Sequence, residues 1–400
     1  MEKTSKLEKP PAYDRISDLP DEILCHILTF LPTKFAFATS VLSKRWISLY
    51  HSLTFIKFDD KSIEDHDQFL HFCRSVEAVT LSPHVQQKPI KKFYLRCGRY
   101  GNWHIPPIDV WIEAINQRGV DYIHLSMNLH RLMPVGDELI RLSNVLFNSQ
   151  NLVVLKLNNL VLSTKILSVN LPSLKALHLK SVYLEIKDFK KLFSGCPILK
   201  ELHTDHFYGK WLKLGYEPNL SKLVRASICP FDVPFKAVYN VKSLCILQLD
   251  SDHSVDIINS YYKDFPVFKK LIHLEICFRH CDHDWDNLAK LLKHSPKLQT
   301  LLIRKRSSSY LTFRKDWENP NSIPKCVSSR LKRCEIRHYE GRNGDLQFAR
   351  YILQNARFLQ VMKLGVSSPS YRKSKIIEDL SSCPRSSEGC KLLFASYGQA

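Results

Sequence analysis

Glycine is scarce in this sequence, with 12 residues in a chain of 400. No G-x-G-x-x-G, Walker, G-x-S-x-G or H-E-x-x-H pattern occurs, which argues against a nucleotide-binding loop, a serine-hydrolase elbow or a zinc-protease helix. No histidine-rich stretch offers a nucleophile arrangement that can be argued. We therefore expect a protein that is non-catalytic in itself and that needs no cofactor.

Long apolar runs are also missing. No run approaches the roughly 18 apolar residues of a membrane span, and Met1–Pro11 is too polar for a signal peptide, so no membrane partner is expected. The 12 cysteines show no framework spacing, which indicates reduced thiols in the nucleus or cytoplasm. Cys97, Cys245 and Cys334 stand in apolar strand-like runs, where a thiol behaves as a small buried hydrophobe.

One group of cysteines and histidines lies close together in the sequence. It consists of Cys277, His280, Cys281 and His283. A structural zinc site requires paired ligands separated by a longer loop, so surface and core roles are favoured here and no metal site is predicted.

Acidic residues are outnumbered, 39 against 58 lysines and arginines, which gives a formal charge of +19. Such an excess favours acidic partners. The cations are scattered, and the nearest approach to a cluster is Arg304, Lys305 and Arg306 with Arg314 and Lys315. A solvated surface is therefore favoured over a nucleic-acid-binding stripe.

The first 14 residues resemble a disordered tail, and a short helical block follows. Asp18 can cap a helix that has Pro20 in its first turn and ends at Pro32. Further helices are predicted at residues 33–41 and 43–49. Three such short helices bury too little apolar surface to be comfortably stable alone, so something else must cover one face.

From residue 53 onward the sequence carries a repeat. An apolar triplet spaced as L-x-x-L-x-L recurs with starts 21 to 37 residues apart, which predicts a solenoid. The twelve triplets are Leu53/Ile56/Phe58, Ile90/Phe93/Leu95, Val120/Ile123/Leu125, Leu152/Leu155/Leu157, Leu174/Leu177/Leu179, Leu199/Leu202/Thr204, Leu220/Leu223/Arg225, Leu244/Leu247/Leu249, Leu271/Leu274/Ile276, Leu298/Leu301/Ile303, Leu331/Cys334/Ile336 and Leu359/Met362/Leu364.

Each repeat combines a strand with an outer segment. The last two triplet positions share one face of a strand, and the mostly polar residues between them share the other. Segments such as residues 186–194 and 285–293 have helical spacing. The predicted fold class is α/β, with a small helical module followed by a solenoid. Its curved parallel sheet carries helices outside and an extended concave surface inside.

Residues 16–49 resemble the F-box of plant F-box proteins. The opening L-P-D-E-I-L, the joint F-L-P-T-K and the block S-V-L-S-K-R-W are all present, and residues 54–60 resemble the strand that follows. Phe35 and Phe37 depart from the pattern, as does the sequence after Trp46. These departures could reshape an edge of the adaptor interface.

Residues 323–366 resemble the FBD region of plant F-box/leucine-rich repeat proteins. The matching elements are Pro324-x-Cys326, the run Tyr339–Gly341 and the run Ala349–Ala356, and residues 383–394 resemble the usual ending. The resemblance divides the chain into a tail (1–14), an F-box (15–52), leucine-rich repeats (53–322) and an FBD region that continues the array (323–400).

The resemblance implies that the F-box docks on a Skp-type adaptor, which bridges to a cullin and its RING partner. Leu19, Pro20 and Trp46 are the first choices as anchors, and Arg45 would hydrogen bond to an acidic adaptor face. Alternatively, about half of the set holds the helices together or seats them on the first repeat. The full adaptor-binding set is Leu19, Pro20, Ile23, Leu24, Leu28, Leu31, Pro32, Val41, Leu42, Ser43, Lys44, Arg45 and Trp46.

The repeats would bind a protein substrate for ubiquitination. Candidate contacts flank the inward leucines: Lys156, His178, Lys180, His203, Gln248, Glu275, Arg304, Arg333 and Arg337, with Asn158, Glu201, Asp250, His273 and Glu335 beside them. For each one, a solvated surface role is the alternative. Arg304, Arg333 and Arg337 adjoin in the expected stack, which suggests an acidic or phosphorylated degron. Two other readings remain, a non-degradative interaction scaffold and a nucleic-acid-binding protein, and the F-box disfavours the second.

Overall fold

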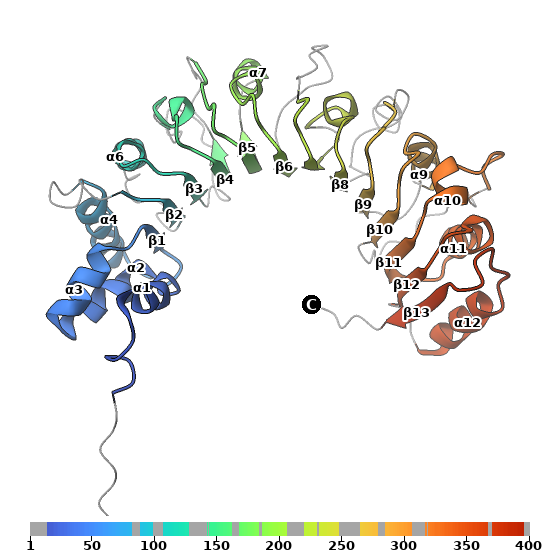
Figure 1. Cartoon of the computed structure of the whole chain (residues 1–400), viewed down its shortest axis with the longest axis horizontal. Helices are drawn as coiled ribbons and strands as arrows, with labels where there is room; N and C mark the ends of the chain where they lie inside the picture. Colours follow the sequence, from blue (N-terminus) through green and yellow to red (C-terminus); the bar gives the residue numbers. More distant parts are fainter. Residues whose placement is uncertain are drawn as a thin grey trace, which may run out of the picture. The chain divides into compact units, whose positions relative to one another are not determined.

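The computed structural model describes residues 14–81, 89–98, 107–127, 142, 144–161, 168–183, 186–205, 220–229, 232–247, 265–278, 285–305, 317, 319–366 and 370–395. The chain separates into two compact units, Met1–Asn128 and Leu129–Ala400. Figure 1 shows the elements of both units in chain order.

Unit 1 begins with the predicted helical block. The helices are α1 (Asp21–Thr29), α2 (Thr33–Ala38) and α3 (Lys44–His51), with a 3₁₀ turn η1 (Thr39–Val41) after α2. The cap predicted for Asp18 is wrong, because Pro20 is the N-cap of α1 and no side chain caps it. The carbonyl of Pro20 accepts from the amides of Ile23 and Leu24, so the proline begins the helix directly.

The three helices share a small core that also rests on the first strand. Leu24, Leu28, Ala36 and Leu49 form its buried centre. The hydroxyl of Thr33 donates to the carbonyl of Lys57 and accepts from its amide, at 2.5 and 2.8 Å. This reciprocal contact joins α2 to β1 and seats the helical module on the repeat array within unit 1.

The remainder of unit 1 alternates strands with helices. Its elements are β1 (Phe55–Asp59), α4 (His66–Thr80), β2 (Lys92–Cys97), α6 (Ile108–Gln117) and β3 (Tyr122–Met127). The strands pair in parallel and in chain order, with Phe58 opposite Leu95 and Leu95 opposite Leu125.

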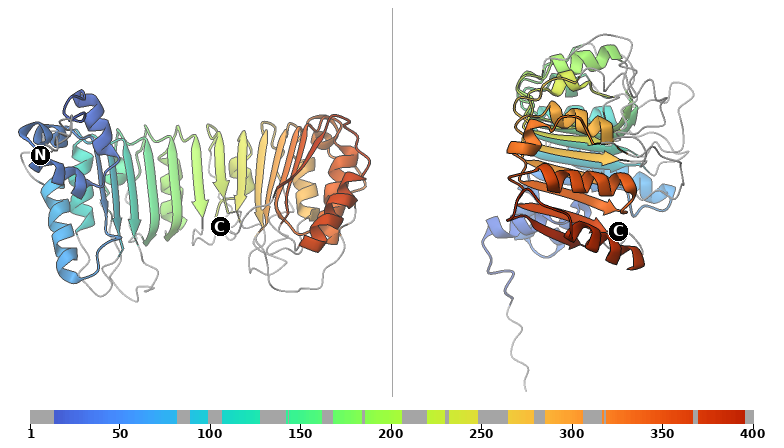
Figure 2. Two further views of the ribbon diagram at one scale, coloured as in Figure 1. Left: turned by 90° about the horizontal axis from the view of Figure 1, so that it is seen from below. Right: turned by 90° about the vertical axis from the view of Figure 1, so that its right-hand side faces the viewer.

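Unit 2 continues with parallel strands that lie side by side in chain order (Figure 2). The strands are β4 (Val154–Val161), β5 (Ala176–Tyr183), β6 (Glu201–Asp205), β7 (Arg225–Ile228), β8 (Ser243–Leu247), β9 (His273–Phe278), β10 (Thr300–Lys305), β11 (Arg333–Tyr339), β12 (Val361–Val366) and β13 (Lys391–Ala395).

The helices of unit 2 follow individual strands. They are α7 (Ile186–Ser194), α9 (Trp285–Lys293), α10 (Lys325–Ser329), α11 (Asn343–Asn355) and α12 (Ser370–Ser381), with 3₁₀ turns η2 (Leu146–Asn148) and η4 (Phe235–Val238). The bounds of α7 and α9 confirm the two predicted helical segments. Figure 1 shows the labelled helices of unit 2 along one side of its strands.

Burial alternates along the strands as the repeat requires. In ten of the twelve predicted triplets the second and third positions are both buried, and the residues between them lie on the opposite, polar face of the sheet. Cys97 and Cys334 are fully buried, as predicted. No helix within the described ranges is long and apolar enough to cross a membrane.

Two predicted triplets are out of register. At β7 the buried positions are Leu223, Ala226 and Ile228. The triplet search missed this register because a small alanine occupies a position usually held by leucine. At β8 they are Val241, Leu244 and Ile246, so Leu247 is half-exposed. The second shift places Cys245 on the polar face, which corrects the prediction that its thiol is a buried hydrophobe.

Candidate functional site

The F-box exposes a group of large apolar side chains. Val41 is 85% exposed, Phe30 74% and Leu42 64%. The complete group, which we call the F-box apolar face, is Ile16, Ile23, Ile27, Phe30, Phe35, Phe37, Val41, Leu42 and Ile47. So much exposed apolar surface on one small module indicates a binding site for another protein.

The predicted adaptor-binding residues separate into three groups by exposure. Leu24 and Leu28 are 0% and 1% exposed, so they hold the helices together. Leu19, Leu31 and Trp46 are half-buried and pack against that core, and Pro32 is also half-buried. The exposed members are Pro20, Ile23, Val41, Leu42, Ser43 and Lys44.

The sequence-based set omitted several members of the F-box apolar face. Ile27 and Phe30 belong to it, and the spacing of Ile27 four residues after Ile23 could have indicated a shared helical face. Phe35 and Phe37, which depart from the F-box pattern, are each 59% exposed. The departures therefore enlarge the apolar surface.

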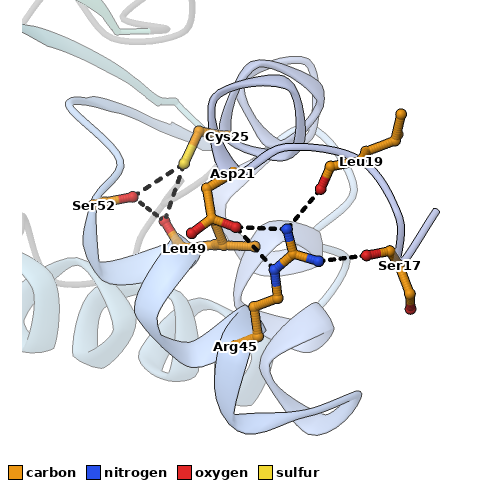
Figure 3. Close-up of polar contacts among 7 residues, drawn as sticks. All are labelled: Ser17, Leu19, Asp21, Cys25, Arg45, Leu49 and Ser52. Carbon is orange, nitrogen blue, oxygen red and sulfur yellow. Dashed lines mark hydrogen bonds and ion pairs between the residues drawn. The ribbon is translucent and has the colours of Figure 1, made fainter.

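Arg45 is engaged within the F-box itself (Figure 3). Its Nε and Nη2 contact Asp21 Oδ1 at 2.8 and 2.6 Å. Its Nη1 and Nη2 donate to the carbonyls of Ser17 and Leu19 at 2.5 and 2.6 Å. We expected these donors to meet an acidic adaptor face, whereas the structure uses them to fix the segment before α1 against α3.

The polar face of β4 to β7 carries a ladder of paired charges and histidines. His178 Nε2 lies 3.1 Å from Glu201, and Glu201 also accepts from Arg225 at 2.6 Å. The His178 and His203 rings stand 5.6 Å apart. Burial lowers the pKa of both histidines, and Lys156 lowers that of His178 further. Lys180, in turn, lies 4.0 Å from Asp205.

The polar face of β9 to β12 gathers the predicted arginines around two carboxylates. Arg304 Nε lies 2.6 Å from Glu275. Glu335 has Arg337 at 2.9 Å, Lys363 at 3.7 Å and Arg333 at 4.0 Å. Four cations thus face two carboxylates, a surplus of two positive charges (4 − 2). Arg304 and Arg337 are register partners, as a shared site requires, but both are already ion-paired.

The other cationic candidates differ in their surroundings. Lys305 is 4% exposed and pairs with the buried Asp345, so the expected basic cluster loses that member. Arg306, Arg314 and Lys315 lie outside the described residues, as do the predicted contacts Gln248 and Asp250.

Cys245, Glu275 and Cys277 form a further cluster on the polar face. Their ligand atoms all lie within 4.8 Å of one another. Cys245 is the register partner of Glu275 across β8 and β9, and Cys277 follows two positions later on β9. Their mutual hydrogen bond raises the pKa of Cys245 and lowers that of Cys277. His280, Cys281 and His283 lie outside the described residues.

Sequence reasoning missed this cluster for two reasons. Cys245 and Cys277 are 32 positions apart, so no short motif contains both. The triplet predicted at β8 was also shifted by three residues, which assigned Cys245 to an apolar run. Only the strand register brings the two thiols together.

Comparisons with known proteins agree with the architecture. Residues 16–57 match the F-box domain family, residues 318–364 match FBD, and residues 108–214 match the LRR repeats of FBD-associated F-box protein At5g56370. These matches fall on α1 to β1, on α10 to β12 and on α6 to the strands that follow it.

Full-length relatives occur in Arabidopsis thaliana. F-box/FBD/LRR-repeat protein At4g26340 is 31% identical, over 95% of this chain and 100% of the relative. FBD-associated F-box protein At5g56370 is 28% identical with the same coverage, and F-box/FBD/LRR-repeat protein At5g56420 is 28% identical over 95% and 99%. The domains, their order and this similarity along nearly the whole length show that the chain belongs to the F-box/FBD/LRR-repeat protein family.

Proposed function

We propose that this protein is the substrate-recognition subunit of a Skp-cullin-F-box ubiquitin ligase. The F-box docks on a Skp-type adaptor, which connects the chain to a cullin and a RING subunit. The polar face of the repeat sheet binds a protein substrate. The chain itself performs no chemistry and contributes proximity and orientation to the transfer of ubiquitin.

The F-box apolar face is the observation that carries the adaptor-binding proposal. Val41, Leu42 and Phe30 cannot be covered by the core beneath them, which is already filled by Leu24 and Leu28. Burial of apolar surface against a partner contributes about 25 cal/mol per Å², so the exposed side chains supply a driving force for docking. The half-buried Leu19 and Trp46 pack against that core.

Arg45 has a positioning role in this interface. Its four contacts fix the segment Ser17–Leu19 beside α3, and that segment contains the anchor Leu19 and directly precedes the anchor Pro20. A preformed docking segment loses less conformational entropy when the adaptor binds. Arg45 therefore acts on adaptor affinity through the geometry of its neighbours.

The adaptor interface is tested with the double substitution Val41→Asp/Leu42→Asp in the full-length chain. We expect it to abolish co-purification of a Skp-type adaptor and cullin, because two charges would be buried against an apolar partner. The matched control is Phe358→Asp, which changes a residue that is 57% exposed in unit 2. Undiminished co-purification of the double variant would contradict the proposal.

Ubiquitination of captured proteins separates a ligase receptor from a scaffold. With the proteasome blocked, the wild type and the Val41→Asp/Leu42→Asp variant are compared for the proteins they retain and for the ubiquitin these carry. A receptor retains its substrates on the variant but loses their ubiquitination. A scaffold shows no ubiquitination with either protein.

An acidic or phosphorylated substrate segment fits the surplus charge around Glu275 and Glu335. Because Arg304, Arg333 and Arg337 are already ion-paired, an incoming phosphate would have to compete with these carboxylates. Its greater charge and its three acceptor oxygens favour such an exchange. The internal carboxylates would also weaken the binding of less charged segments.

Charge reversal tests whether the substrate segment is acidic or phosphorylated. The triple variant Arg304→Glu/Arg333→Glu/Arg337→Glu is expected to lose captured substrates while it retains the adaptor. The matched control is Lys290→Glu/Lys293→Glu/Lys297→Glu, which reverses three exposed cations on α9 and in the turn after it, outside the polar face of the strands. A triple variant that captures the same substrates as the wild type would rule out the acidic segment and leave the adaptor proposal intact.

A further inference from the structure

We propose that Cys245, Glu275 and Cys277 bind a thiophilic divalent cation, Zn²⁺, on the polar face of β8 and β9. This site is independent of adaptor docking and of ubiquitin transfer. Within the part of the chain that the structure describes, it is the one group of three cysteine, histidine or carboxylate side chains whose ligand atoms converge closely enough to hold a metal ion.

The strand register brings the three ligands together. Cys245 lies directly across from Glu275, and Cys277 lies two positions further along the same strand and face. The buried neighbours Leu244, Leu274 and Ile276 fix the strands beneath them, since they are at most 1% exposed. The ligands therefore belong to rigid strands and need no loop movement to converge.

The spacing suits a tetrahedral ion. With Zn–S bonds of about 2.3 Å, two thiolates on a tetrahedral zinc lie about 3.8 Å apart, and a carboxylate oxygen lies slightly closer. The three ligand atoms already lie within 4.8 Å of one another, so shifts of less than about 1 Å bring them to these positions. Two thiolates and one carboxylate are a donor set that zinc accepts.

A disulfide between Cys245 and Cys277 fits this geometry less well than a bridging ion does. Strand spacing of about 4.8 Å and a rise of about 3.3 Å per residue put diagonal Cα atoms about 8 Å apart. Disulfides usually need Cα atoms within about 6.8 Å of each other. Both cysteines are free thiols. A bridging ion spans this separation without moving the backbone.

Neighbouring polar groups would support the ligands. Arg304 Nε lies 2.6 Å from Glu275 Oε1, the oxygen that also accepts from Cys277 Sγ at 3.9 Å, so the arginine orients the carboxylate beside the thiol. Ser227, the register partner of Cys245 on β7, hydrogen bonds to the Cys245 side chain. Outer contacts of this kind are common around protein-bound metals and fix the ligand geometry. Three protein ligands leave the fourth position of the ion for water.

Site-resolved alkylation with Zn²⁺ alone tests the proposal on the reduced full-length protein. We expect Zn²⁺ to slow alkylation of Cys245 and Cys277 together, as measured by peptide mass spectrometry, and a chelator to reverse this. Cys25 and Cys73 are also half-buried free thiols, and their alkylation should not change. Equal rates for Cys245 and Cys277 with and without Zn²⁺ would overturn the proposal.

Variants then identify the ligands. In Cys245→Ser the protection of Cys277 should disappear, and in Cys277→Ser that of Cys245 should disappear. Each of these two variants should lose more Zn²⁺ affinity than the roughly 10–100-fold typical of an outer-shell change. Glu275→Gln should also weaken Zn²⁺ binding, whereas Cys73→Ser should leave it unchanged. Persistent protection of Cys277 in Cys245→Ser would show that other groups hold the ion, and would refute this ligand set.

Discussion

Arg45 shows how one side chain can fix the geometry of a segment that lies more than 20 residues away in the sequence. Its side chain is 39% exposed, and its guanidinium joins α3 to Asp21 and to the carbonyls of Ser17 and Leu19. Planar donors that reach several acceptors at fixed angles are specific to arginine, because a lysine ammonium is a single point charge on a flexible stem.

We therefore expect Arg45→Lys to be nearly as harmful as Arg45→Ala, each reducing local stability by about 1–2 kcal/mol. The measurement is amide hydrogen exchange in peptides covering residues 14–30, which should speed up in both variants. Lys44→Ala, which removes the exposed cation next to Arg45, is the control and should leave exchange unchanged. Full rescue by lysine would mean that charge alone matters at this position.

The buried pair Lys305 and Asp345 is a second residue-scale feature. Both side chains are 3% exposed, and Lys305 also lies 5.9 Å from the centre of the Trp285 ring. Removing one partner leaves a buried charge, so Asp345→Asn should cost about 3–5 kcal/mol. The double variant Lys305→Met/Asp345→Leu removes both charges and should be less destabilised than Asp345→Asn.

Denaturant unfolding of unit 2 measures this difference in the full-length protein. Lys180→Met is the matched control, because it removes one member of a pair in which the lysine is 56% exposed, and it should cost no more than about 1 kcal/mol. A double variant less stable than Asp345→Asn would indicate that the pair is a net stabiliser of α11 against β10.

At the scale of elements, the histidine ladder of β5 and β6 predicts a dependence of stability on pH. Burial lowers the pKa of His178 and His203 in the folded chain below the usual value of about 6.5. Near and below that pH the unfolded chain binds more protons than the folded chain does. The free energy of unfolding should therefore fall as the pH drops from about 6.5 to 5.

The variant His178→Gln/His203→Gln should flatten this decline, as measured from urea midpoints at several pH values. Glu201 has its pKa lowered by Arg225 against the effect of burial, and its contribution is lost only at more acidic pH. His273→Gln, which removes an exposed histidine of β9, is the control. An undiminished decline in the double variant would assign the effect to other groups.

The individual strands and helices differ in how well the sequence predicted them. Leucine spacing located the strands where large residues fill the core, as at Leu155 and Leu157 in β4. It failed at Ala226 because a small alanine occupies a position usually held by leucine. It failed at Ile246 because Cys245 and Leu247 give β8 apolar residues on both faces, which makes the register ambiguous. The F-box helices were predictable from Pro20 and Pro32, but the contacts of Arg45 depend on segments brought together only by folding.

At the scale of the whole molecule, the parallel array limits how far a local change can spread. Each inner strand of unit 2 pairs with the strands before and after it in the sequence, so repeat stability depends mainly on nearest neighbours. Long arrays of this kind need not unfold in one cooperative step. Two cavity variants in separate repeats of unit 2 can measure this independence.

Leu364 in β12 and Leu179 in β5 are both fully buried, so replacement by alanine should cost about 2–5 kcal/mol in each case. Hydrogen exchange should speed up in β11 to β13 for Leu364→Ala and in β4 to β6 for Leu179→Ala, with little effect on the other group. Each variant is thus the control for the other. Equal acceleration across all strands of unit 2 would show that the unit unfolds as one block. Local responses would instead show that each group of neighbouring strands opens independently of the distant ones, as nearest-neighbour coupling predicts.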